Sequence, residues 1–186
     1  MARFPKPTRE ALLAAADKTV PDVIAPGLRV LFCGINPSLY TAAVGYHFAR
    51  PGNRFWPALH AAGFTDRVLH PSEQKVMLAN GYGITNVVDR ATATAEELSP
   101  RELAEGGRRL EAKVRRYKPE VLAVLGVTAY RAAFARPKAA VGEQPEAIGP
   151  TRIWVLPNPS GLNAHYRLDA LARLYREMLE ALTASR

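Results

Sequence analysis

The chain has 186 residues, 48% of them hydrophobic and 23% charged, which is the composition of one globular domain and excludes a mainly disordered chain. Its single cysteine, Cys33, excludes an internal disulfide, a cysteine-ligated iron–sulfur cluster and a four-cysteine zinc site. Lys and Arg total 25 against 17 Asp and Glu, and this net charge of +8 favours a polyanionic partner such as nucleic acid.

No apolar run is long enough to cross a membrane, and residues 12–16 are too few for the core of a signal peptide. We therefore expect a cytoplasmic protein. A monomer is a separate expectation. Residues 1–27 are predicted to form a basic extension that contains one short helix over 8–18. This extension is typical of a solvated tail, although an arm that contacts DNA is the alternative. A single domain is expected over residues 28–186.

Four short apolar strands alternate with helices along the rest of the chain. The strands are expected at residues 29–34, 83–88, 121–125 and 153–156, and the helices at 54–62, 72–80, 99–117, 128–134 and from Leu168 onwards. This alternation predicts an α/β fold, a three-layer sandwich whose central, mainly parallel four-stranded sheet is flanked by helices. In such sheets a ligand binds beyond the carboxyl ends of the strands.

Two of these strand ends carry the same tripeptide. Asn36-Pro37-Ser38 follows the first strand, and Asn158-Pro159-Ser160 follows the fourth. Either motif alone is an ordinary turn, but their occurrence at the same predicted edge favours a shared site. Asp89 follows the second strand and is a third polar candidate, although it could equally serve as a helix cap or as the ion-pair partner of Arg90.

The loop behind the first motif is rich in aromatic residues and arginines, from Gly45 to Trp56. Aromatic faces stack on bases, and arginines hold phosphates. We expect Phe55 and Trp56 to anchor the next helix in the core, whereas Phe48 and His47 are candidates for ligand contact.

Together these motifs resemble the mismatch-specific uracil-DNA glycosylases, which are relatives of thymine-DNA glycosylase in the uracil-DNA glycosylase superfamily. The matching segments are GINP at 34–37, FA at 48–49, PGNRFW at 51–56 and NPSGL at 158–162. Similarity extends over about residues 25–182. The resemblance implies an enzyme that extrudes uracil, and damaged pyrimidines such as etheno-cytosine, from G-mismatched double-stranded DNA. It then hydrolyses the N-glycosidic bond without a metal or other cofactor.

The resemblance also implies roles for individual residues. Asn36 would position the attacking water and Phe48 would stack on the extruded base, with Ile35, Ser38 and His47 completing the pocket. The loop at 158–163 would insert into the duplex, with Leu162 as the wedge. The resemblance implies DNA contacts for the remaining members, Asn158, Pro159, Ser160, Gly161 and Asn163. Three residues depart from the family pattern and bear on base preference and opposite-strand recognition: Ser38, Tyr40 and Asn163.

Asn36 carries an amide, which orients water but takes no proton at neutral pH. We therefore expect Asp89 to assist, either by stabilising positive charge on the sugar or by accepting the proton of the water. Two other readings stay open. One is a basic nucleic-acid-binding domain without catalysis, and the other is a nucleoside hydrolase that uses the same crevice.

Overall fold

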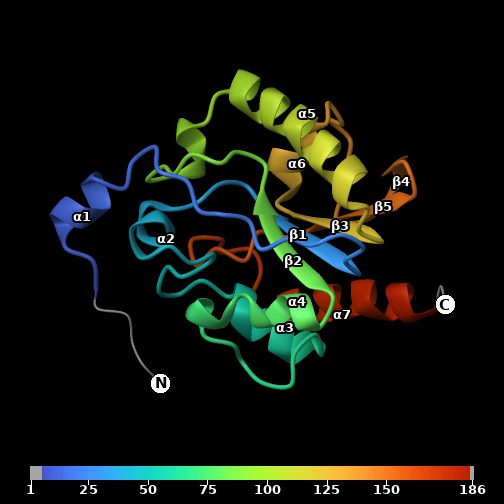
Figure 1. Cartoon of the computed structure of the whole chain (residues 1–186). Coiled ribbons are helices and arrows are strands. Elements are labelled where there is room, and N and C mark those ends of the chain that lie inside the picture. Colours follow the sequence, from blue (N-terminus) through green and yellow to red (C-terminus); the bar gives the residue numbers. More distant parts are fainter. Residues whose placement is uncertain (1–5, 185–186) are drawn as a thin grey trace.

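Five strands form the central sheet of the structure, a computed structural model that describes residues 6–184 (Figure 1). The strands are β1 (Val30–Gly34), β2 (Tyr82–Asn86), β3 (Val121–Leu125), β4 (Gly142–Ile148) and β5 (Thr151–Leu156). They lie in the order β2-β1-β3-β5-β4. β1, β2, β3 and β5 run parallel, and β4 pairs antiparallel with β5. The predicted α/β class and the mainly parallel sheet are confirmed.

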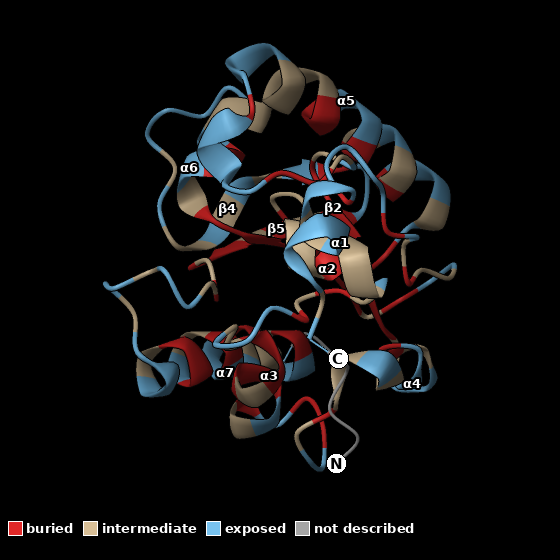
Figure 2. Cartoon of the chain, turned by 90° about the vertical axis from the view of Figure 1, so that its left-hand side faces the viewer, coloured by how far each residue is buried: buried red, intermediate tan, exposed pale blue. Residues whose placement is uncertain are grey.

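Helices cover both faces of this sheet, as the layers in Figure 1 show. The helices are α1 (Arg9–Leu13), α2 (Leu39–Val44), α3 (Phe55–Ala62), α4 (Val76–Ala79), α5 (Pro100–Tyr117), α6 (Val127–Ala133) and α7 (Leu168–Ala184). Side chains of α3, α4 and α7 form one apolar core with the sheet, and side chains of α5 and α6 form the other. In Figure 2 the buried residues accordingly concentrate in the strands and on the inner helix faces. Within residues 6–184, no helix has both the length and the apolar character needed to span a membrane.

The sheet has one strand more than predicted. β4 is an edge strand whose residues alternate between half-buried and exposed, and it contains Pro145, so it carries no apolar run that could reveal it.

The helix α2 was also not expected from the sequence. The Ser38 hydroxyl caps this helix by accepting a hydrogen bond from the Thr41 amide at 3.1 Å, and the supposed turn therefore begins a helix.

Two predicted helices are shorter or begin differently. The helix expected over 8–18 is limited to α1, which spans Arg9–Leu13 and is capped by the side chain of Thr8. The segment expected as one helix over 72–80 is a 3-10 turn at Pro71–Glu73 followed by α4. The side chain that caps this 3-10 turn belongs to His70 rather than to Ser72.

The segment before β1 packs against the domain along part of its length. Val23 is 4% exposed and forms an isolated bridge with Ile84 of β2, with backbone hydrogen bonds of 2.9 and 2.7 Å. The Asp22 carboxylate pairs with Lys113 of α5 at 2.5 Å. Residues 22–23 therefore cover the outer edge of β2. Residues 1–5, which include the basic Arg3, lie outside the described residues.

Candidate functional site

A cleft of about 390 Å³ opens at the carboxyl ends of the parallel strands. Gly34, Asn86 and Leu125 are the last residues of β1, β2 and β3, and all three line the cleft. β1 and β3 are neighbours in the sheet, and the helices that follow them pack on opposite faces: α3 and α4 after β1, and α6 after β3. An α/β fold places its ligand at such a point. The predicted crevice is therefore present, and the segments 34–38, 47–53, 92–96 and 158–163 contribute its walls.

Asn36 is half-buried in the cleft, and its amide has one defined orientation. The amide nitrogen donates to the Arg90 carbonyl at 3.0 Å and to Thr92 Oγ1 at 2.7 Å. Thr92 Oγ1 donates its own hydrogen to the Thr94 carbonyl at 2.7 Å, so it accepts from Asn36. Because both partners accept, the nitrogen side of Asn36 faces them and the amide oxygen remains available to a water molecule in the cleft.

Phe48 presents an aromatic face at the bottom of the cleft. One side of its ring stacks on Phe55 of α3, with centroids 4.0 Å apart and planes at 30°. Its backbone has φ of +54°, an uncommon value for a residue with a side chain, and its ring lies against Gly34 of β1. Gly34 makes room for it, because a Cβ at that position would lie 3.3 Å from the ring. Phe48 is thus positioned to stack on a planar ligand.

Two other predicted pocket residues use their polar atoms within the protein. His47 is 2% exposed, and its Nε2 lies 3.0 Å from the carbonyl of Pro21, to which it can only donate. Burial lowers the pKa of His47, which keeps the ring neutral. The Ser38 hydroxyl is occupied as the cap of α2. Both residues border the cleft, but their side chains chiefly fix its walls.

The loop at 158–163 closes the other side of the cleft. Asn158, Ser160, Leu162 and Asn163 line it, whereas the buried Pro159 and the exposed Gly161 do not. The turn is held internally by a hydrogen bond of 3.0 Å from the Ser160 amide to Asn158 Oδ1 and by one of 3.0 Å from Asn163 Nδ2 to the Asn158 carbonyl. At its tip the Leu162 side chain is 70% exposed. An apolar side chain on so rigid a turn is suited to insertion between stacked bases.

The structure does not bring Asp89 to the cleft. Ile35 lines it, and its carbonyl accepts from the Val88 amide at 2.9 Å, but the next residue, Asp89, is exposed and is not among the lining residues. The two charged side chains that do line the cleft are Arg50 and Glu96. Glu96 lies in the 3-10 turn Ala95–Glu97 and is exposed.

Asn86 was missed in the sequence because it ends an apolar strand and was read as part of that strand. It is 6% exposed and lines the cleft, and no described residue forms a hydrogen bond with its side chain. Gly34 again allows the arrangement, since a Cβ there would lie 2.6 Å from Asn86 Oδ1. Its amide lines the cleft and is not used by the described residues, so Asn86 is available to pair with the polar edge of a ligand. The feature that could have identified Asn86 from the sequence is its position, as a polar residue at the end of a predicted parallel strand.

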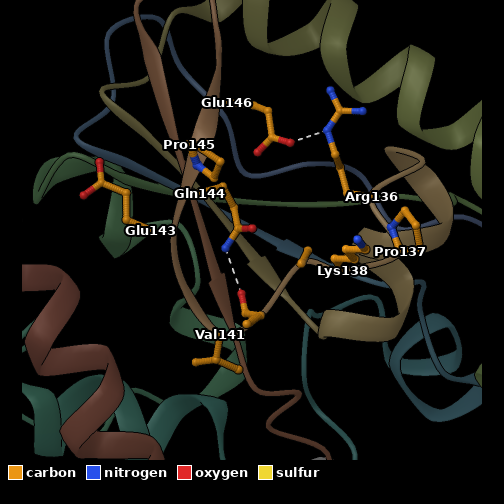
Figure 3. Close-up of a pocket in the computed structure, with 10 residues that line it drawn as sticks. Arg136, Pro137, Lys138, Val141, Glu143, Gln144, Pro145 and Glu146 are labelled. Carbon is orange, nitrogen blue, oxygen red and sulfur yellow. Dashed lines mark hydrogen bonds and ion pairs between the residues drawn. The ribbon is translucent and has the colours of Figure 1, made fainter.

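A second cavity of about 490 Å³ lies between residues 136–141 and β4 (Figure 3). Three of its four charged side chains are engaged in ion pairs: Arg136 pairs with Glu146, and Glu143 pairs with Arg152, which leaves Lys138. Gln144 Nε2 donates to the Ala140 carbonyl at 2.8 Å. These pairings leave the strand-end cleft as the stronger candidate site.

Among the described residues, no group of three or more His, Cys, Asp or Glu side chains converges as a metal site would require. Cys33 is buried in β1, and burial raises the pKa of its thiol, so it is not an activated nucleophile. The groups that the cleft offers are amide, hydroxyl, aromatic and main-chain groups, together with the charged side chains of Arg50 and Glu96.

Comparison with known proteins shows the fold and the family of the chain. A solution NMR structure of a Methanosarcina acetivorans protein, provisionally named a uracil DNA glycosylase, is similar to this chain. The TM-score is 0.58 at 19% identity, over 88% of this chain and 98% of the other. This similarity establishes the shared fold. The family model of the uracil DNA glycosylase superfamily matches residues 21–183, which include every segment that lines the cleft. The chain therefore belongs to the uracil DNA glycosylase superfamily.

Proposed function

We propose that this protein is a monofunctional, mismatch-specific DNA glycosylase. It would remove uracil opposite guanine from double-stranded DNA and leave an abasic site. The main support for this function is that three features line one cleft. They are the oriented amide of Asn36, which can bind water, the ring of Phe48, which can stack on a base, and the loop with the exposed Leu162. A base inside a duplex is out of reach of any active site, so these three elements correspond to extrusion, capture and hydrolysis.

Each step has a residue suited to it. Leu162 occupies the space that the extruded base leaves and offsets the lost stacking. Phe48 stacks on the base, and the unpaired amide of Asn86 hydrogen-bonds its polar edge. Arg50, exposed at the cleft, is available to a phosphate. The net charge of +8 supports attraction to the DNA backbone as a whole.

Hydrolysis breaks the bond between C1′ of the sugar and N1 of the pyrimidine, and a new bond forms between C1′ and the water oxygen. The pyrimidine leaves with the electron pair as an anion and takes up a proton, while the water loses one. Asn36 orients the water through its amide oxygen. The backbone N–H of Phe48, which donates to no described residue, is available to the developing anion.

The attacking water must also lose a proton, and the groups compared here as its acceptor are Asp89, Glu96 and solvent. Asp89 is exposed outside the cleft, so its assistance would require an arrangement on DNA that differs from the present one. Glu96 is the carboxylate that lines the cleft. We propose that neither is as important as Asn36, and that solvent accepts the proton. Asp89→Asn and Glu96→Gln, measured beside Asn36→Ala, rank the three contributions.

Base preference follows from the same pocket. The family resemblance implies that Asn158 replaces a histidine found in strictly uracil-specific superfamily members, so base discrimination would rely on Asn86 and main-chain groups. We propose that etheno-cytosine and 5-substituted uracils are also accepted. Duplexes that carry one such base opposite guanine, incubated with the protein in EDTA and then treated with alkali, test this directly. Cleavage of a uracil opposite adenine as fast as one opposite guanine would contradict mismatch specificity.

The alternative of a nucleoside hydrolase predicts release of uracil from free deoxyuridine. Such an enzyme has no use for an exposed Leu162, whereas the glycosylase needs it for extrusion. Duplex cleavage without turnover of deoxyuridine supports the glycosylase. Duplex binding without any cleavage supports the non-catalytic binding domain.

A further inference from the structure

Arg54 holds the loop that carries Leu162 through four backbone carbonyls. Its Nη1 donates to Tyr166 at 2.5 Å, and its Nη2 donates to Ser160 at 2.5 Å and to Asn163 at 2.7 Å. Its own backbone amide donates to Pro159 at 2.9 Å. One residue thus contacts the loop from its beginning to its end.

These contacts are the loop's main attachment to the domain. In the described part of the chain, every hydrogen bond that joins residues 158–163 to a segment outside 158–165 involves Arg54. The remaining close approach is steric: a Cβ on Gly161 would lie 2.6 Å from the Gly52 carbonyl oxygen. The backbone of the loop therefore packs directly against the backbone of residues 52–54.

The chemistry of Arg54 is unusual for a half-buried cation. No ion pair within residues 6–184 involves it, and its Nε is buried without a partner. Its charge is thus balanced by carbonyl dipoles rather than by a carboxylate. The planar guanidinium fork reaches several carbonyls at fixed angles, which a lysine ammonium on a flexible stem does not reproduce. Charge-assisted hydrogen bonds of this kind are stronger than neutral ones.

We propose that Arg54 is a positioning residue that preorganises the 158–163 loop for insertion into DNA. The inference rests on the proposed glycosylase function and deepens it. A loop that is already ordered inserts Leu162 without the entropy cost of fixing it at the moment of binding. Arg54 touches neither the base nor the water in this account, and it acts on the reaction through Leu162.

The test compares Arg54→Lys with the matched control Arg176→Lys. Arg176 also donates to a backbone carbonyl, that of Ala61 at 2.5 Å, but this carbonyl lies in α3 and not in the 158–163 loop. Hydrogen exchange at the amides of Ser160, Leu162 and Asn163 reports on the loop, and kcat and KM are measured on a duplex with one G·U pair. We expect Arg54→Lys to speed this exchange and to lower kcat/KM about tenfold, since at least one charge-assisted bond is lost. The control should change neither.

A double-mutant cycle separates positioning from a general structural role. If Arg54 acts through Leu162, then Arg54→Lys added to Leu162→Ala costs less than about twofold, because the loop no longer has a wedge to deliver. An equal loss in both backgrounds, or unchanged loop exchange, overturns the proposal. Should Arg54→Lys fail to fold, Gly161→Ala displaces the loop with Arg54 intact and must show the same non-additivity. If wild type cleaves no substrate, the proposed function fails, while the exchange measurement still decides whether Arg54 holds the loop.

Discussion

The side-chain nitrogen of Asn36 lies 2.7 Å from Thr92 Oγ1, and this contact decides which end of the amide faces the cleft. We expect Thr92→Val to lower kcat on a G·U duplex about tenfold, because the amide then loses one of the two acceptors that fix it. The KM should change little. Thr183→Val removes a similar hydroxyl on the outer helix α7 and serves as the control. Equal kcat for Thr92→Val and wild type would show that the orientation of Asn36 does not limit the reaction.

Phe48 should contribute to binding the extruded base rather than to the chemical step. Base stacking on an aromatic side chain is worth about 1–3 kcal/mol, so Phe48→Ala is expected to weaken binding of a uracil-containing duplex by roughly tenfold to 100-fold. Binding of an undamaged duplex, which relies on phosphate contacts, should be unaffected. Fluorescence anisotropy with both duplexes measures the difference, and an equal loss for the two would argue that the variant is simply misfolded.

Leu162 should be dispensable for folding and essential for duplex activity. Its side chain is 70% exposed, so Leu162→Ala is expected to leave the free energy of unfolding within about 0.5 kcal/mol of wild type. Cleavage of a G·U duplex should fall steeply, because nothing then replaces the extruded base. Leu13→Ala, at a position 64% exposed on α1, is the matched control and should leave cleavage intact. Full activity of Leu162→Ala would favour the nucleoside hydrolase.

The neutral His47 predicts a pH dependence of stability. Burial lowers its pKa, so below about 6.5 the unfolded state binds the proton more readily than the folded state. The free energy of unfolding should therefore fall as the pH falls from 7.5 to 5.5. Asp22 and Lys113 are the charged groups that act on the ring, and they oppose each other. His47→Gln keeps a donor near Pro21 and should flatten this slope in urea titrations. An unchanged slope would mean that another group carries it.

The close packing of α5 against α6 at Gly107 can be tested by a stability measurement. A Cβ on Gly107 would lie 2.1 Å from the carbonyl oxygen of Ala133 in α6. Although alanine favours helices, we expect Gly107→Ala to lower the free energy of unfolding by about 1–3 kcal/mol. Urea denaturation measures this, with Arg108→Ala on the exposed side as the control. A stabilised Gly107→Ala would show that α5 can shift away from α6.

Much of this architecture could be predicted because buried parallel strands carry apolar runs. β1 and β3 are buried at every residue and were recognised for that reason. β4 was missed because an edge strand needs no apolar run. Asn86 was missed for the opposite reason: it is polar but belongs to a fully buried strand, so the pattern hid a residue of the site.

Some residues of the candidate site could likewise be predicted from the sequence, and others could not. Asn36 and Phe48 were identified from motifs whose residues lie close together in sequence. The sequence could place Asp89 after a strand but could not tell which way the turn directs its side chain. The contacts of Arg54 with residues 159–166 join segments more than 100 positions apart, and a local sequence pattern cannot predict contacts of this kind.

The most direct test is the single-turnover cleavage of a labelled duplex with one G·U pair, in EDTA, by wild type and by Asn36→Ala. Alkali then reveals abasic sites as strand breaks. We expect cleavage by wild type and a loss of at least about 100-fold in Asn36→Ala, with duplex binding retained, because a misplaced water costs that much. Equal rates for the two proteins, or tight binding without cleavage by wild type, would contradict this expectation.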